Sequence, residues 1–70
     1  MSTRQVPIRD ESIRLAQFLK LADLIEVGSE ARELVADGRV TVNGSTERRR
    51  GRQLAKGDVV EVRGESAQVG

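Results

Sequence analysis

The sequence predicts a small α+β domain in which two N-terminal helices pack on a short antiparallel sheet. In the first half of the chain, apolar residues recur three and four positions apart, which is the period of a helix buried on one face. After Gly38 the period falls to two, as in strands, and the stretch 31–44 joins the two patterns through a helix end, a short strand and a tight turn. The 70 residues make one domain, which we place at residues 1–70, and they leave little core in which to build a large cavity.

The N-terminal segment, residues 1–11, has no helical period. Val6 and Ile8 flank Pro7, which lacks an N–H and restricts a strand there to the edge of a sheet. We therefore expect a short edge strand or an extended arm.

The first helix is expected to begin between Asp10 and Ser12, because either side chain can accept a hydrogen bond at a helix N-terminus. Arg14, Gln17 and Lys20 fall together on its polar face. Its apolar stripe is formed by Ile13, Leu15, Ala16, Phe18, Leu19 and Ala22.

Leu24 and Ile25 are expected to end the first helix or to pack in the turn after it. Ser29 is expected to cap the second helix, with Glu30 in its first turn, where the helix dipole favours negative charge. Gly38 ends that helix, since a helix often stops at a residue with positive φ and glycine adopts this conformation at least cost.

The second half of the chain alternates strands and turns. Val40 and Val42 point to one side of a strand, and Asn43-Gly44 is a strong signal for a two-residue hairpin turn. After this turn we expect a polar return strand over 45–49 and a connection over 51–56 that Leu54 anchors. A turn at 57–58 then leads into a strand with Val60 and Val62 facing inward. A final edge strand is expected at 67–69.

Composition excludes several kinds of site. The chain has no Cys and no His, which excludes thiol catalysis, disulfides, zinc sites built on these residues and imidazole acid–base chemistry. No pair of carboxylates forms a recognisable catalytic arrangement, so we expect no enzyme, no metal and no cofactor. No apolar run is long enough to span a membrane and the N-terminus lacks the apolar core of a signal peptide, so we expect a cytoplasmic protein.

Basic charge is concentrated in one segment. The whole chain has a net charge of +1, but residues 44–57 carry five basic residues against Glu47, a net charge of +4. Ten of the twelve basic residues are Arg, whose planar guanidinium suits phosphates and base edges. A charge run is usually a solvated loop, but three consecutive arginines repel one another unless an anion binds them. We therefore interpret this segment as a nucleic-acid contact.

Six short motifs follow one another in the order and spacing of the S4 RNA-binding domain, which the chain resembles over residues 13–62. They are Arg14-Leu15, Phe18-Leu19, Ala31-Arg32 with Leu34-Val35, Gly38-Arg39-Val40, Val42-Asn43-Gly44 and Gly57-Asp58-Val59-Val60. The chain looks most like the small stand-alone bacterial S4 proteins. The resemblance implies the αL motif, in which two helices pack on a small antiparallel sheet, and binding of structured RNA such as ribosomal RNA.

The resemblance implies RNA contacts at Arg14, at Arg32 and at the Asn43-Gly44 turn. Many members of the family have Ser-Arg where this chain has Val27 and Gly28. We expect the run Arg48-Arg49-Arg50-Gly51-Arg52 to compensate for that missing cation. Together with the charge pattern, this gives the candidate RNA-binding residues Arg14, Lys20, Arg32, Arg39, Asn43, Arg48, Arg49, Arg50, Arg52 and Lys56.

Several of these residues also have a purely structural interpretation. Arg14 and Lys20 suit the polar face of a helix, and Arg32 suits a local ion pair. Arg39 suits the end of a helix, where its charge is favourable, and Asn43 is first of all a turn residue.

The expected function is non-catalytic binding of folded RNA through its backbone and shape, in association with a ribosome or another ribonucleoprotein and not with a membrane. Phe18 is the single aromatic residue, which argues against a platform for base stacking. One alternative is a β-grasp sulfur carrier, although the chain ends in one glycine, Gly70, where carriers have two. The other is a protein-interaction adapter on a ribosome or nuclease, with an acidic face formed by Asp23, Glu26, Glu30, Glu33 and Asp37.

Overall fold

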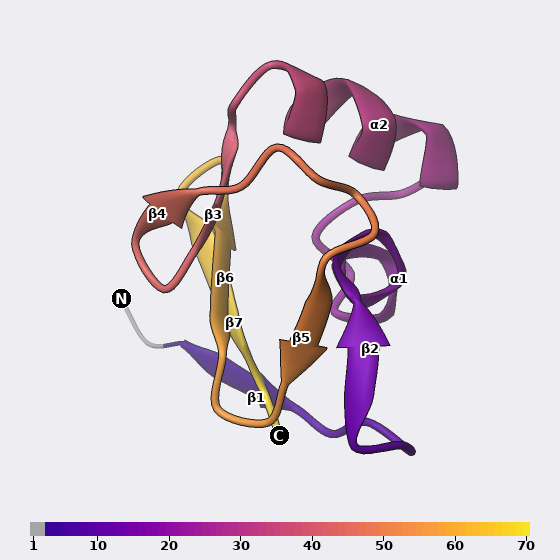
Figure 1. Ribbon diagram of the computed structural model, residues 1–70, viewed down its shortest axis with the longest axis vertical. Helices are drawn as coiled ribbons and strands as arrows, with labels where there is room; N and C mark the ends of the chain where they lie inside the picture. The colour runs from indigo at the N-terminus through magenta and orange to yellow at the C-terminus, as the bar shows by residue number, and fades with distance from the viewer. Residues whose placement is uncertain (1–2) are drawn as a thin grey trace.

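Two helices and a two-stranded sheet lie on one side of a five-stranded sheet, and the hydrophobic core fills the space between these layers (Figure 1). The computed structural model describes residues 3–70. Within them the elements are β1 (Arg4–Val6), β2 (Ser12–Arg14), α1 (Leu15–Leu21), α2 (Gly28–Ala36), β3 (Val40–Val42), β4 (Ser45–Thr46), β5 (Gln53–Ala55), β6 (Val59–Val62) and β7 (Glu65–Val69).

The larger sheet has the order β1-β7-β6-β3-β4. β1 pairs with β7 in parallel, and the other neighbours are antiparallel, so the sheet is mixed where an antiparallel one was predicted. β2 and β5 pair in antiparallel and form the second sheet, with Ile13 opposite Leu54. The predicted class, an α+β fold with two packed helices on a small sheet, is confirmed.

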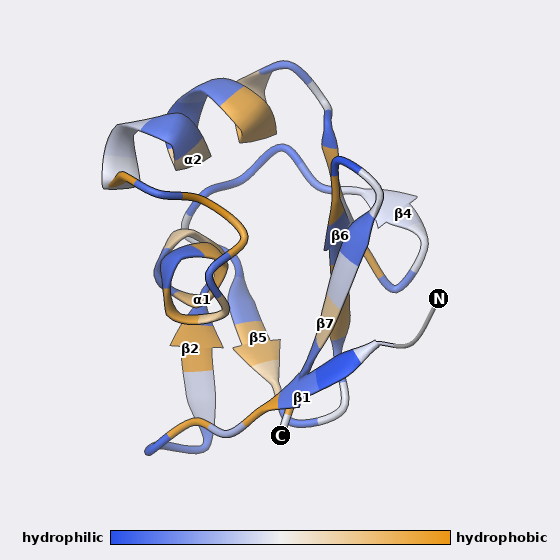
Figure 2. Cartoon of the chain, turned by 180° about the vertical axis from the view of Figure 1, so that it is seen from behind, coloured by the Kyte–Doolittle hydropathy of each residue, from blue (hydrophilic) through white to orange (hydrophobic). Residues whose placement is uncertain are grey.

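The core is aliphatic apart from Phe18, which is fully buried. Val40 and Val42 of β3 face Val60 and Val62 of β6 from neighbouring strands, and all four are buried, as their alternation predicted. Leu24 and Ile25 are buried in the connection after α1, which Figure 2 colours as a hydrophobic stretch between the two helices. The two helices within residues 3–70 are too short and too polar to span a lipid bilayer.

The start of the first helix was predicted wrongly. Residues 12–14 form β2, and α1 begins only at Leu15, so Ile13 belongs to a strand and not to the helical stripe. The reason is long-range: β2 pairs with β5, a segment that the sequence pattern gave as an irregular connection. Strand pairing of this kind overrides the local capping signal of Asp10 and Ser12.

The cap of the second helix also differs from the prediction. α2 begins at Gly28 with Val27 as its N-cap residue, so Ser29 lies inside the first turn. The carboxylate of Glu30 accepts the N–H groups of Val27 at 3.1 Å and of Glu26 at 2.8 Å. These two hydrogen bonds favour the ionised form of Glu30 and so lower its pKa, and the bond from Val27 has the larger effect.

The junction between the helices and the sheet follows the sequence closely. Gly38 has φ 73° at the end of α2, as predicted. Asn43 and Gly44 have φ values of 52° and 85°, and this pair of positive φ angles defines a type I′ hairpin turn between β3 and β4.

The strands at the ends of the sheet were partly predicted. β1 is an edge strand, as expected next to Pro7, but β7 lies between β1 and β6 and is not an edge. The return strand β4 has two residues, Ser45 and Thr46, because the chain turns inward at the buried Glu47.

Candidate nucleic-acid interface

The segment from β4 to β5, residues 47–52, is called the arginine loop here, and Glu47 organises it. This residue is 7% exposed and is the one buried charged residue within residues 3–70. Its carboxylate accepts the N–H groups of Arg48 and Arg49, each at 3.1 Å. It also accepts the guanidinium groups of Arg52 at 2.8 Å and of Arg49 at 3.2 Å.

These contacts set the charge of the carboxylate. The hydrogen bonds from Arg52 and then Arg49 lower the pKa of Glu47 from 4.5 to about 2, so the group is ionised at neutral pH. Two of the arginines of the loop are thereby partly neutralised. The side chain of Arg49 stays 78% exposed, whereas that of Arg52 is 32% exposed.

Backbone hydrogen bonds fix the arginine loop to the start of α1. The N–H of Leu15 donates to the carbonyl of Arg52 at 2.8 Å, and the N–H of Ala16 donates to that of Arg50 at 3.1 Å. The first N–H groups of a helix have no acceptor within the helix. In α1 the arginine loop supplies two acceptors, the carbonyl groups of Arg52 and Arg50. Arg50 is therefore held beside the beginning of α1, on the side where β2 ends with Arg14.

Arg14 and Arg50 line the same hollow, although they come from segments far apart in the sequence. The hollow has a volume of about 420 Å³ and its other lining residues are Ala16, Gln17 and Gly51. Both arginines are exposed, and within residues 3–70 neither takes part in an ion pair. Two unpaired guanidinium groups at a site without a carboxylate suit an anion.

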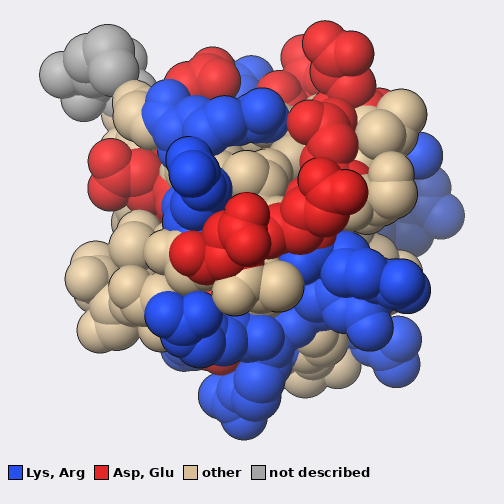
Figure 3. All heavy atoms as spheres, turned by 90° about the horizontal axis from the view of Figure 1, so that it is seen from above, with Lys and Arg blue, Asp and Glu red and all other residues tan. Residues whose placement is uncertain are grey.

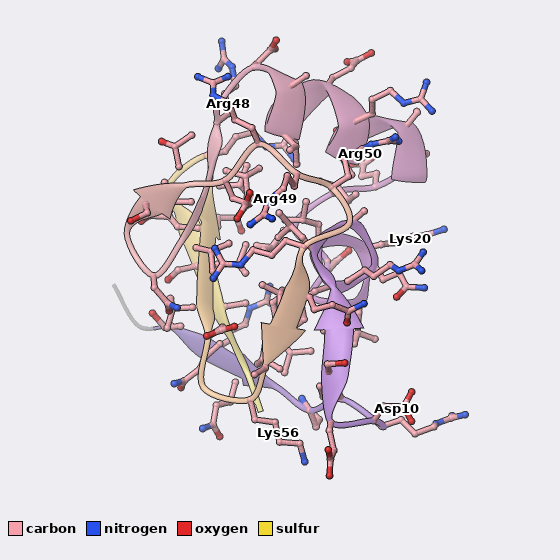
Figure 4. The ribbon with its side chains drawn as sticks, viewed as in Figure 1. Asp10, Lys20, Arg48, Arg49, Arg50 and Lys56 are labelled. Atoms are coloured by element: carbon pink, nitrogen blue, oxygen red, sulfur yellow. The ribbon has the colours of Figure 1, made fainter. Side chains whose placement is uncertain are left out.

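Lys20 lies two turns of the helix further on, on the exposed side of α1. Figure 4 shows Lys20 and Arg50 on the side of the molecule formed by the helices, and Arg49 nearer the middle of the view. The structure thus brings together Arg14 and Arg50, with Lys20 at the neighbouring hollow. Arg49 and Arg52 are instead paired with Glu47.

Arg48 has a structural role. Its Nη1 donates to the carbonyl of Ala36 at 3.1 Å, at the end of α2. Its guanidinium lies against Gly38 so closely that a Cβ at this glycine would come within 2.9 Å of Nη2. A cation at this place satisfies a terminal carbonyl and complements the helix dipole.

Asn43 connects two turns. Its Oδ1 accepts the N–H of Val59 at 2.9 Å and its Nδ2 donates to Asp58 at 3.1 Å. The other oxygen of Asp58 accepts the N–H of Ala55 at 2.9 Å. This bond is the main cause of the lowered pKa of Asp58. Both polar atoms of the Asn43 amide thus have hydrogen-bond partners, and its positive φ of 52° agrees with its interpretation as a turn residue.

The remaining candidates, Arg32, Arg39 and Lys56, do not line the hollow of Arg14 and Arg50. Lys56 lies in the turn after β5, and Figure 4 places it at the opposite end of the molecule from Arg48 and Arg50. Arg32 is exposed on α2 and Arg39 is exposed between α2 and β3.

The surface around α2 has mixed charge. Figure 3, which looks onto the α2 end, shows a band of acidic side chains across the middle and basic side chains on both sides of it. α2 carries Glu30 and Glu33, and Asp37 follows it. The acidic band separates the basic groups on this face of the molecule.

Two arginines that sequence analysis did not single out fix the connection between the helices. Arg4 donates to the carbonyl of Ala22, and Arg63 donates to that of Leu24 at 2.7 Å. Arg63 also pairs with Glu30 at 3.6 Å. No local pattern predicts these contacts, because the partners are 18 and 39 residues apart.

Comparison with known proteins agrees with this fold. The S4 domain family model matches residues 6–70. The chain is 48% identical over 59 residues to the probable ribosome maturation protein RlbA of Bacillus subtilis (strain 168), an alignment that covers 84% of this chain and 83% of that protein.

Two solved structures are similar. YbcJ of E. coli, whose solution structure revealed an αL motif involved in RNA binding, superposes with a TM-score of 0.74 at 28% identity, over 99% of this chain and 89% of YbcJ. The 30S ribosomal protein S4e from Thermoplasma acidophilum superposes with a TM-score of 0.63 at 32% identity, over 83% of this chain and 31% of that longer protein. The resemblance inferred from the sequence motifs is confirmed, and the chain belongs to the S4 domain family.

Proposed function

We propose that this protein binds structured RNA, without catalysing a reaction, through the cations that the arginine loop and α1 hold side by side. The observation that carries the proposal is the hollow lined by Arg14 and Arg50, which contains two unpaired guanidinium groups and no carboxylate. The RNA-binding motif of YbcJ and the ribosomal relatives support RNA as the anion. A ribosomal RNA in the cytoplasm is the target we propose.

In this proposal phosphates supply most of the affinity. Arg14 and Arg50 contact the RNA backbone and release counterions, and Lys20 and Arg49 extend the contact along the same side. The logarithm of the affinity then falls with the logarithm of the salt concentration with a slope of roughly −0.7 to −0.9 per phosphate neutralised.

The state of three of the eleven carboxylates supports a non-catalytic role. Glu30, Glu47 and Asp58 each accept hydrogen bonds that keep them ionised and fixed, so their structural roles are accounted for. General acid–base catalysis needs a group that titrates near the working pH. The pKa values of these three carboxylates are lowered and therefore lie further from neutral pH than those of ordinary carboxylates.

The sulfur-carrier alternative requires a C-terminal glycine that an activating enzyme can reach. The N–H of Gly70 donates to the carbonyl of Val6 at 2.8 Å, and a Cβ at Gly70 would lie 3.3 Å from that oxygen. Gly70 is thus held against β1, and we do not propose carrier chemistry.

The test is a matched pair of charge reversals measured by fluorescence anisotropy with a labelled ribosomal RNA hairpin. Arg50→Glu introduces a carboxylate beside Arg14, and we expect the affinity to fall by about tenfold or more at moderate salt. Lys56→Glu makes the same change in net charge at the opposite end of the molecule and should have a much smaller effect. Equal losses in the two variants would contradict the proposed site, and binding of the wild-type protein that does not depend on salt would contradict the mechanism.

A further inference from the structure

A second hollow lies further along α1, and its lining is mainly apolar. Its volume is about 500 Å³ and it is lined by Ala16, Gln17, Lys20, Leu21 and Gly28. Leu21 is 52% exposed, although it belongs to a helix whose Phe18 and Leu19 are fully buried. A Cβ at Gly28 would meet no atom within 4 Å, so the hollow is open on the α2 side as well.

This hollow adjoins the one that Arg14 and Arg50 line. Ala16 and Gln17 line both. Neither lining contains a carboxylate, and Lys20 lines the apolar hollow together with Leu21. An RNA strand whose phosphates lie at Arg14 and Arg50 would therefore have an apolar surface next to it, and that surface carries one cation of its own, Lys20.

We propose that this second hollow receives an unpaired nucleotide of the bound RNA. The base packs on Leu21 and on the aliphatic stem of Lys20, whose ammonium contacts the adjoining phosphate. The amide of Gln17, which both donates and accepts hydrogen bonds, lies between the two hollows and can contact the base edge. The proposal rests on the proposed function, because it assumes that RNA occupies the neighbouring cationic hollow.

A nucleotide suits this surface better than an apolar protein segment does. A protein helix would gain little from the neighbouring cations unless it were acidic, whereas every nucleotide joins a flat apolar face to a phosphate. Proteins that bind unpaired bases commonly stack them on aromatic rings, but Phe18 is fully buried and the chain has no other aromatic residue. Aliphatic surface is therefore what this protein offers to a base, and Leu21 is the largest exposed part of it in the hollow.

The test compares two RNA hairpins that are identical except for one unpaired adenosine in the stem. Wild-type protein should bind the bulged hairpin more tightly. Leu21→Ser removes apolar contact without changing charge, so it should weaken binding of the bulged hairpin by about fivefold and leave the fully paired hairpin and the salt dependence unchanged. Val27→Ser is the matched control, since Val27 is 54% exposed but does not line the hollow.

A fluorescent adenine analogue at the unpaired position gives a second readout. Its emission should change on binding to the wild-type protein and to Val27→Ser, but much less with Leu21→Ser. Equal affinity of Leu21→Ser and Val27→Ser for the bulged hairpin, with equal emission, would overturn the proposal. Failure of the underlying function is distinguishable, because then Arg50→Glu would leave binding of both hairpins unchanged.

Discussion

The carboxylate of Glu47 and the guanidinium of Arg52 form a hydrogen-bonded ion pair of 2.8 Å at the base of the arginine loop. The same carboxylate accepts two backbone N–H groups and the side chain of Arg49. Glu47 thus fixes this basic segment. It offsets part of the charge of Arg49 and Arg52, whereas Arg50, beside Arg14, has no ion-pair partner within residues 3–70.

Replacing Glu47 by Gln should loosen the arginine loop. Gln has the same shape but no charge, so Arg49 and Arg52 would repel each other and the N–H groups of the loop would lose a strong acceptor. We expect a lower midpoint of thermal unfolding and poorer discrimination between RNA hairpins, measured by circular dichroism and fluorescence anisotropy. Glu65→Gln, at an exposed position of β7, is the control that changes net charge equally. Identical midpoints for the two variants would show that the Glu47 carboxylate is dispensable.

Stability should depend on pH in the acidic range. Because the pKa of Glu47 falls from 4.5 to about 2 on folding, ionised Glu47 stabilises the folded state above pH 4.5, and this contribution disappears as the pH falls towards 2. Glu30 and Asp58, whose pKa values are also lowered, act in the same direction. Denaturant midpoints measured across this range should fall with pH in the wild-type protein and fall less in Glu47→Gln. A parallel pair of curves would exclude Glu47 as a source of the acid sensitivity.

The local part of the fold could be predicted from the sequence, and the long-range part could not. Gly38 and the Asn43-Gly44 turn have backbone conformations that few residue types adopt. The residue types at these positions therefore predicted the helix end and the hairpin turn. The pairing of Ile13 with Leu54 joins two short segments with no clear strand pattern, and it turned a predicted first helical turn into β2.

In the candidate site, too, the local features could be predicted from the sequence and the long-range contacts could not. Arginine content identified the segment, but the roles of its members depend on partners that only the tertiary structure defines. Arg48 points back to the carbonyl of Ala36, whereas Arg50 lies beside Arg14. Three consecutive identical residues therefore have different environments, and no property of the run itself distinguishes them.

Asn43 provides a test of the distinction between turn residues and RNA contacts. Asn43→Ala removes the bonds to Val59 and Asp58 and places alanine at φ 52°, so we expect a loss of stability of about 2 kcal/mol. Asn43→Gly removes the same bonds without the strain and should cost less. RNA affinity measured below the unfolding transition should stay close to that of the wild-type protein in both. A large loss of affinity in Asn43→Gly, with the fold intact, would instead make Asn43 an RNA contact.

Gly28 is the position at which one added side chain should change the way this protein binds RNA. Its φ lies outside the left-handed region and a Cβ would meet no atom within 4 Å, so substitution there is compatible with the fold. Gly28→Arg adds a cation at the edge of the apolar hollow. We expect tighter binding at low salt and a salt slope steeper by roughly 0.7 to 0.9, the contribution of one phosphate. The same side chain occupies space beside Leu21 and should reduce the preference for a hairpin with an unpaired nucleotide.

Gly28→Gln separates the effect of the added positive charge from the effect of the added side-chain volume. Its side chain fills part of the hollow without a cation, so it should reduce the preference for the bulged hairpin but leave the salt slope at the wild-type value. Anisotropy titrations of both hairpins at several salt concentrations measure the two effects independently. Equal salt slopes for Gly28→Arg and Gly28→Gln would mean that no phosphate passes this edge of α1, and the RNA path from Arg50 towards Leu21 would then be wrong.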